Sequence, residues 1–144
     1  MTKFIPLSDG FWVSPQIGPE DVAAAKSLGV TLIVNNRPDG EEPGQPKGAA
    51  IEAAARAAGL SYVAIPISGM GIGADQLARF ENAVRANDSG VLAFCRSGTR
   101  STVLRALARA RAGEAIDEII NEAAAAGYNI AGQRRALEAA AKNG

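Results

Sequence analysis

Short apolar runs of strand length recur along this chain, and each is followed by a polar loop and then by a segment rich in alanine. Residues 30–34 (VTLIV) and 91–94 (VLAF) are typical of buried strands. Such strands occur in parallel sheets that helices cover on both faces. The sequence therefore predicts an α/β fold with a parallel-dominated central sheet flanked by helices, and we expect residues 1–144 to form a single domain.

Predicted strands and helices alternate along most of the chain. Further strands are expected at residues 4–6, 11–13 and 62–65, and helices at 19–28, 48–58, 75–84, 105–111, 115–126 and 133–142. The last helix has few large apolar residues, so we expect it to fray.

Composition excludes several classes of function. Histidine is absent and cysteine occurs once, which excludes Cys-His and Ser-His-Asp catalysis, a cysteine-based zinc site and an intramolecular disulfide. We expect no metal and no cofactor. The formal net charge is +0, which favours neither nucleic acid nor a membrane as a partner, and it leaves the oligomeric state open. No stretch has the length of a membrane span or the apolar core of a signal peptide, so we expect a cytoplasmic location.

The single cysteine follows the apolar run 91–94 and opens a small polar loop, CRSGTRS, ahead of a predicted helix. The backbone N–H groups of such a loop attract anions, and two neighbouring arginines favour the thiolate. We therefore predict that Cys95 is a nucleophile and that Arg100 acts beside it. Substrate-binding contacts are expected from Arg96, Ser97, Gly98, Thr99 and Ser101. Arg96 could instead face solvent or pair with an acidic residue, and a lone cysteine can also serve only in packing.

A long polar loop at residues 35–46 follows the buried strand 30–34. Because the carboxyl ends of parallel strands share one edge of a sheet, this loop should approach the cysteine loop. It carries Arg37, a candidate substrate-binding residue, and three carboxylates, Asp39, Glu41 and Glu42. A solvated proline–glycine loop without a role in the site is an equally good interpretation.

A glycine-rich loop at residues 68–73 should reach the same edge. It contains no carboxylate. Met70 and Ile72 are candidates for an apolar wall beside the cysteine, with a purely structural role as the alternative. Asp75 follows the loop and is expected to cap the next helix. Which of the four carboxylates in these two regions reaches the cysteine is left open.

Two motifs together carry a resemblance to a known family. NNRPDGEEPGQP at residues 35–46 and FCRSGTRS at residues 94–101 are similar to a bacterial family of small phosphatase-like proteins in the cysteine-dependent phosphatase superfamily. Members also occur fused to beta-lactamase-hydrolase-like domains, and they are variously described as phosphatases or sulfur transferases. The resemblance runs from about Phe4 to Gly132. It implies a dual-specificity-phosphatase-like fold with a reactive cysteine in the loop between a strand and a helix.

The spacing between the cysteine and the arginine helps to decide whether the cysteine attacks phosphorus, as in a phosphatase, or sulfur, as in a sulfurtransferase. Five residues separate the two in tyrosine and dual-specificity phosphatases, whereas four separate Cys95 from Arg100 here, and Ser101 stands where that arginine would fall. The shorter loop is similar to that of the rhodaneses, which hold a persulfide. The loop that corresponds to the general-acid loop of the phosphatases, residues 68–73, lacks a carboxylate. Both departures favour sulfur.

The sequence thus favours a rhodanese-like sulfurtransferase. Cys95 would take sulfane sulfur from a small anionic donor as a persulfide and pass it to a thiol or cyanide. The first alternative is a cysteine-dependent phosphatase that hydrolyses phosphotyrosine or a small phosphoester through a phosphocysteine. The second is a non-catalytic anion- or sulfur-sensing module.

Overall fold

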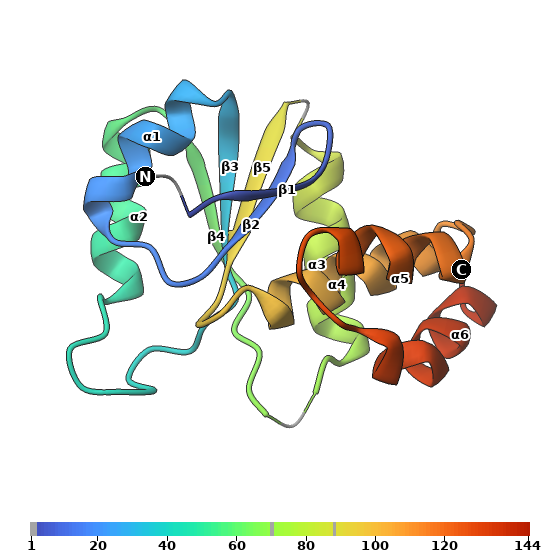
Figure 1. Ribbon diagram of the computed structural model, residues 1–144. Helices are drawn as coiled ribbons and strands as arrows, with labels where there is room; N and C mark the ends of the chain where they lie inside the picture. Colours follow the sequence, from blue (N-terminus) through green and yellow to red (C-terminus); the bar gives the residue numbers. More distant parts are fainter. Residues whose placement is uncertain (1–2, 70, 88) are drawn as a thin grey trace.

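A five-stranded sheet lies at the centre of the computed structural model, which describes residues 3–69, 71–87 and 89–144 (Figure 1). The strands lie in the order β1-β2-β5-β3-β4. Their bounds are β1 Ile5–Ser8, β2 Phe11–Ser14, β3 Val30–Asn35, β4 Ser61–Ala64 and β5 Gly90–Phe94. β1 runs antiparallel to β2, and the other pairs are parallel. The predicted parallel-dominated α/β fold is confirmed.

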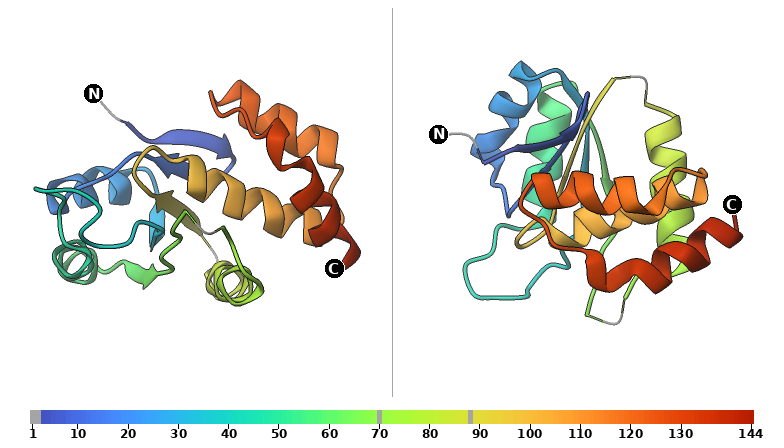
Figure 2. Two further views of the ribbon diagram at one scale, coloured as in Figure 1. Left: turned by 90° about the horizontal axis from the view of Figure 1, so that it is seen from below. Right: turned by 45° about the vertical axis from the view of Figure 1, so that its right-hand side comes forward.

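Helices cover both faces of this sheet (Figure 2). A 3-10 turn at Pro19–Asp21, α1 (Val22–Ser27) and α2 (Gly48–Ala57) lie against one face. On the other face lie α3 (Ala74–Arg85) and α4 (Thr99–Arg111). α5 (Ile116–Ala125) and α6 (Arg134–Lys142), which follows a 3-10 turn at Ala131–Gln133, pack against α4. None of the helices in the described ranges is long and apolar enough to cross a membrane.

The central position of β5 in the sheet explains why its sequence is continuously apolar. Val91 and Ala93 point into the core on the α3–α6 side, whereas Leu92 and Phe94 point into the core beneath α1 and α2. All four are at most 3% exposed. A strand buried on both faces cannot alternate between apolar and polar residues.

Three expectations about helix ends are wrong. The helix after the cysteine begins at Thr99 rather than at residue 105. Asp75 does not cap α3, because Gly73 is the N-cap residue and the side chain of Gln76 accepts its backbone N–H at 2.5 Å. The last helix is packed rather than frayed, since Leu137 is fully buried against the core of the α3–α6 side.

Candidate functional site

The cysteine loop lies at the carboxyl edge of the sheet, between β5 and α4 (Figure 1). Cys95 is fully buried, and its Sγ accepts a hydrogen bond from the backbone N–H of Gly98 at 3.0 Å. Gly98 is the N-cap residue of α4 and has a φ of 98°, a left-handed conformation that favours glycine. The first N–H groups of α4 have no intrahelical acceptor, so the thiol lies beside a helix end that attracts anions.

Arg100 connects the segments that follow β3, β4 and β5. Its Nη1 donates to Glu41 Oε2 at 2.8 Å and to the carbonyl of Ile67 at 2.6 Å, and its Nη2 donates to Glu41 Oε1 at 2.9 Å. The hydrogen bonds that Arg100 donates to Glu41 raise the pKa of Arg100, with a smaller contribution from the nearby Cys95. The structure therefore brings these three segments together around the arginine that follows the cysteine.

Arg37 lies beneath this contact and organises two carboxylates. Its side chain is 1% exposed, and its three nitrogens donate to Glu41 (2.8 Å), Glu42 (2.9 Å) and the side chain of Gln16 (3.1 Å). Burial opposes the positive charge, but the two carboxylates more than compensate and raise the pKa of Arg37. With all of its nitrogens engaged, Arg37 positions the glutamates and presents no free guanidinium to a substrate.

The two glutamates differ in their surroundings. Glu41 bridges Arg100 and Arg37, whose hydrogen bonds lower its pKa to about 2. The pKa of Glu42 is lowered by the hydrogen bond from Arg37 and then by the charge of Arg96. The side chain of Arg96 is 66% exposed and lies 3.7 Å from Glu42. Arg96 thus adopts the alternative placement, facing solvent while paired with an acidic residue.

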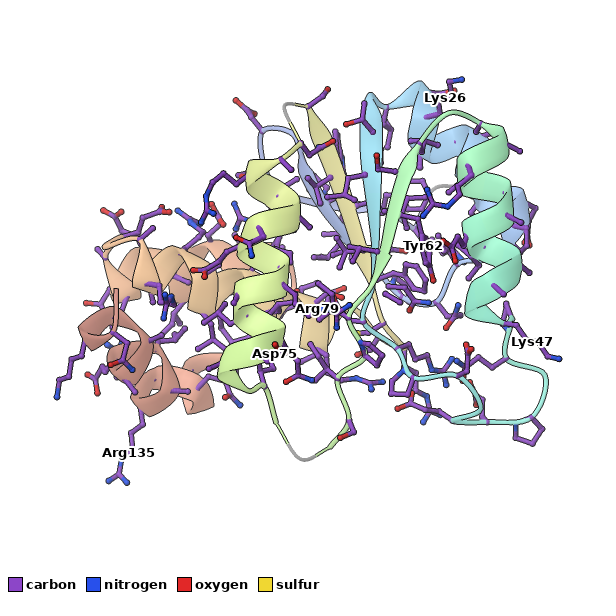
Figure 3. All side chains as sticks on the ribbon, turned by 180° about the vertical axis from the view of Figure 1, so that it is seen from behind. Lys26, Lys47, Tyr62, Asp75, Arg79 and Arg135 are labelled. Carbon is purple, nitrogen blue, oxygen red and sulfur yellow. The ribbon has the colours of Figure 1, made fainter. Side chains whose placement is uncertain are left out.

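The two candidate aspartates belong to other parts of the structure than the cysteine loop. Asp39 Oδ1 accepts the backbone N–H of Gly48 at 2.9 Å, at the start of α2. Asp75 is in the first turn of α3, as Figure 3 shows. Of the four candidate carboxylates, Glu41 is the one bonded directly to Arg100.

Hydroxyl groups form hydrogen bonds on the exposed side of the cysteine loop and on its buried side. Ser97 Oγ donates to Thr99 Oγ1 at 3.0 Å, and both residues are exposed. Ser101 is fully buried, and its hydroxyl donates to Asn36 Oδ1 at 2.8 Å. The Ser101 contact ties α4 to the residue after β3, and the Ser97–Thr99 contact stays within the cysteine loop.

Two residues that the sequence analysis did not single out support the loop. Asn36 Nδ2 donates to the carbonyl of Ile65 at 2.9 Å, so one buried amide links the segments after β3 and β4 to α4. Tyr128 Oη donates to the carbonyl of Ser97 at 3.0 Å. Asn36 lies within the long polar motif, which is a usable signal. Tyr128 follows an alanine-rich helix, and no local pattern connects it to the cysteine.

A cavity of about 400 Å³ opens beside Arg100. Its wall comes from the 67–72 loop, α4 and the region of α6, with Ile67, Ser68, Gly69, Gly71, Ile72, Thr99, Arg100, Val103, Leu107, Gln133 and Ala136. Arg100 is the one charged residue among these. Ile72 lines this cavity, but Cys95 does not, so an apolar wall beside the cysteine stays a prediction. Met70 lies outside the described residues. Within the described ranges, no group of three or more acidic, cysteine or histidine side chains could hold a metal ion.

Comparison with known sequences gives consistent matches. Residues 3–112 match a family described as beta-lactamase hydrolase-like protein, phosphatase-like domain. A beta-lactamase hydrolase-like protein of Xylella fastidiosa (strain Temecula1) is 37% identical over 105 residues, which cover 73% of this chain and 24% of that protein. One from Agrobacterium fabrum is 35% identical over 115 residues, covering 80% and 26%. The match therefore spans about a quarter of the length of these curated relatives.

Solved structures with the same fold include cysteine-based phosphatases. A candidate phosphatase from Neisseria meningitidis superposes with a TM-score of 0.85 at 33% identity, covering 97% of this chain and 99% of that one. The kinase-associated phosphatase, studied with its catalytic-site cysteine replaced by serine, gives a TM-score of 0.76 at 14% identity, covering 94% and 90%. At that identity the second likeness concerns the fold alone.

Proposed function

Since this chain belongs to the family of phosphatase-like domains of beta-lactamase hydrolase-like proteins, we propose that it is a cysteine-dependent phosphatase acting on phosphomonoesters. The family model is described as phosphatase-like, and the structure from Neisseria meningitidis that is 33% identical is described as a candidate phosphatase. The rhodanese-like sulfurtransferase favoured by the sequence has no such support. The fold and the relatives thus back the alternative over the first expectation, although the short spacing between cysteine and arginine remains a departure from the larger superfamily.

The observation that carries this proposal is the placement of Arg100. Glu41 takes up the Nη1–Nη2 end of the guanidinium. Among the described residues, the oxygen atoms that accept from Arg100 are hydrogen-bonded to Nη1 and Nη2, and hydrogen bonding and charge from Cys95 contribute to the raised pKa of Arg100, so the guanidinium lies beside the sulfur. In this proposal the Nε–H is the donor to a phosphate oxygen held near Cys95. Arginine offers two parallel donors to a phosphate, and the first N–H groups of α4 add more.

In the proposed reaction, the Cys95 thiolate attacks phosphorus. The S–P bond forms as the P–O ester bond breaks, and the leaving oxygen keeps the electron pair and takes a proton from solvent water. Arg100 and the N-terminal N–H groups of α4 hold the non-bridging oxygens through the transition state. Water then attacks the phosphocysteine, the S–P bond breaks, and inorganic phosphate leaves with the thiolate restored.

The site favours particular leaving groups. Glu41 has a pKa of about 2 and is ionised at neutral pH, so it does not supply the proton. Phosphoesters whose leaving group is stable as an anion need little help from an acid. Aryl phosphates fit this requirement, and the largely apolar cavity beside Arg100 has room for an uncharged ring. We therefore expect aryl phosphates to be hydrolysed faster than alkyl phosphates.

The test is to follow phosphate release and intact mass together. The reduced protein is mixed with a phosphotyrosine peptide, and separately with thiosulfate, alongside Cys95→Ser. Cysteine-dependent turnover, with a phosphoryl adduct on Cys95 after rapid acid quenching, is expected. A gain of one sulfur that cyanide removes, without phosphate release from the peptide, would overturn the phosphatase in favour of sulfur transfer. If Cys95 reacts with neither the phosphotyrosine peptide nor thiosulfate, the result would favour the non-catalytic module.

A further inference from the structure

The peptide unit that joins Ser97 to Gly98 is held at both of its ends. Its N–H, from Gly98, points inward and donates to Cys95 Sγ at 3.0 Å. Its carbonyl, from Ser97, points outward and accepts the hydroxyl of Tyr128 at 3.0 Å. A peptide unit is planar, so fixing the direction of the carbonyl also fixes the direction of the N–H. We infer that Tyr128 is a positioning residue that aims this N–H at the reactive sulfur.

This peptide needs an external hold because Gly98 follows it. Glycine populates left-handed and right-handed conformations about equally well, so the loop has little intrinsic preference for one direction of the peptide. With the peptide reversed, the carbonyl oxygen would face the sulfur and its partial negative charge would oppose the thiolate. A fixed donor outside the loop favours the orientation that stabilises the thiolate.

Tyr128 is well placed to be that donor. It is 9% exposed, and its own backbone N–H donates to the carbonyl of Ala123 at 2.9 Å, which holds the tyrosine independently of the cysteine loop. Burial raises the pKa of Tyr128, and the nearby Cys95 adds to the shift, so the hydroxyl keeps its proton. The approach is close: a Cβ atom on Gly98 would lie 2.2 Å from Tyr128 Oη. Gly98 is therefore required by this contact as well as by its backbone conformation.

Tyr128 lies in the C-terminal part of the chain, beyond the residues that match the family. The family match ends at residue 112, whereas Tyr128 lies between α5 and the 3-10 turn that precedes α6. We therefore assign part of the control of Cys95 to the C-terminal segment. This assignment rests on Cys95 being the nucleophile, as proposed above, but it does not depend on whether phosphorus or sulfur is attacked.

The experiment uses Tyr128→Phe, which keeps the ring and removes the hydroxyl. Because Cys95 is the only cysteine, its ionisation can be followed by the ultraviolet absorbance of the thiolate, with Cys95→Ser as the baseline. We expect the midpoint of that titration to move upward by about half to one pH unit, and turnover at neutral pH to fall about three- to tenfold with little change in KM.

The matched control is Tyr62→Phe. Tyr62 is the other tyrosine, its hydroxyl accepts a hydrogen bond from Asn35 at 2.9 Å, and it lies on β4 (Figure 3). This variant should titrate like the wild-type protein. A Tyr128→Phe midpoint equal to that of Tyr62→Phe, even with a lower melting temperature, would show a merely structural role and overturn the inference. A shifted midpoint in a protein without phosphatase turnover would refute the proposed reaction and leave this inference standing.

Discussion

Arg100 and Glu41 meet through two hydrogen bonds, and in the proposed reaction this pair sets the direction from which the phosphate reaches Cys95. A guanidinium on a flexible chain would lose conformational entropy on binding phosphate, whereas this one is already fixed by Glu41 and by the carbonyl of Ile67. Glu41 is itself held by the buried Arg37. At the scale of single residues, the site is a chain of ion pairs from Arg37 through Glu41 to Arg100, and the proposed function assigns the remaining edge of Arg100 to the substrate.

Replacing Arg100 with lysine tests that geometry. Lysine keeps the charge but offers no planar pair of donors, so it cannot hold Glu41 and a phosphate oxygen in the same arrangement. We expect kcat/KM for an aryl phosphate to fall about a hundredfold, a loss typical of removing a transition-state donor. The control is Arg135→Lys, on α6, whose side chain projects away from the molecule (Figure 3). Equal activity of the two variants would contradict the assigned position of Arg100.

The low pKa of Glu41 predicts a loss of stability in acid. The unfolded chain binds a proton at Glu41 near the ordinary value of 4.5, whereas the folded protein binds it only near 2. Glu41 therefore stabilises the fold above pH 4.5, and this contribution is lost as the pH falls toward 2. Urea unfolding between these limits should show a steeper decline for the wild-type protein than for Glu41→Gln. Glu138→Gln, at an exposed position on α6, should leave the decline unchanged, and a Glu41→Gln profile parallel to wild type would contradict the prediction.

At the scale of elements, the cavity beside Arg100 is formed by parts of the chain far apart in sequence. The 67–72 loop, α4 and Ala136 of α6 line it. Replacing Ala136 with phenylalanine should fill part of this space. We expect kcat/KM for a two-ring aryl phosphate to fall about tenfold relative to phenyl phosphate, because the larger ring no longer fits.

Ala139→Phe is the control, since Ala139 is exposed on the same helix and does not line the cavity. It introduces the same side chain with the same change in helix propensity. If the two variants have the same ratio of kcat/KM values for the two substrates, the cavity does not receive the leaving group. The ratio of the two substrates is the decisive quantity, because a general loss of folded protein cancels from it.

Elements with strong patterns were predictable from the sequence. β3 and β5 are buried on both faces, so their composition alone identifies them. The start of α4 was misplaced because Thr99 and Ser101 are common in loops, and only the conformation of Gly98 shows that the helix begins directly after it. The capping role predicted for Asp75 failed for a similar reason, since Gln76 lies one residue farther and reaches the N-cap residue instead.

The candidate site was predictable only in part. Cys95, Arg100 and the convergence of three loops follow from residues at the ends of predicted strands. The hydrogen-bond partners of these residues could not be predicted in this way. Whether Glu41 or Glu42 would bond Arg100, and that Tyr128 would reach the cysteine loop, depend on contacts between distant segments. No periodicity or motif in a single sequence records such contacts.

At the scale of the whole molecule, the C-terminal helices complete the core on one side of the sheet. Leu137 of α6 is fully buried there, in the same cluster as Leu104 of α4 and Tyr128. If residues 1–144 form a single cooperative domain, a cavity at Leu137 should destabilise the entire fold and the cysteine loop with it. An α6 that is only peripherally attached would instead melt separately.

Leu137→Ala should therefore lower the free energy of unfolding by about 3 kcal/mol while the transition stays single. Urea unfolding followed by far-ultraviolet circular dichroism and by the fluorescence of Trp12, on the sheet, would give the two signals needed. Leu28→Ala is the matched control, because Leu28 is 45% exposed at the end of α1 and its truncation should cost less than about 0.5 kcal/mol. Coincident transitions from the two probes, displaced only for Leu137→Ala, would establish that the helix beyond the family match is part of the unit that holds Cys95. Separate transitions would contradict this and would place α6 outside it.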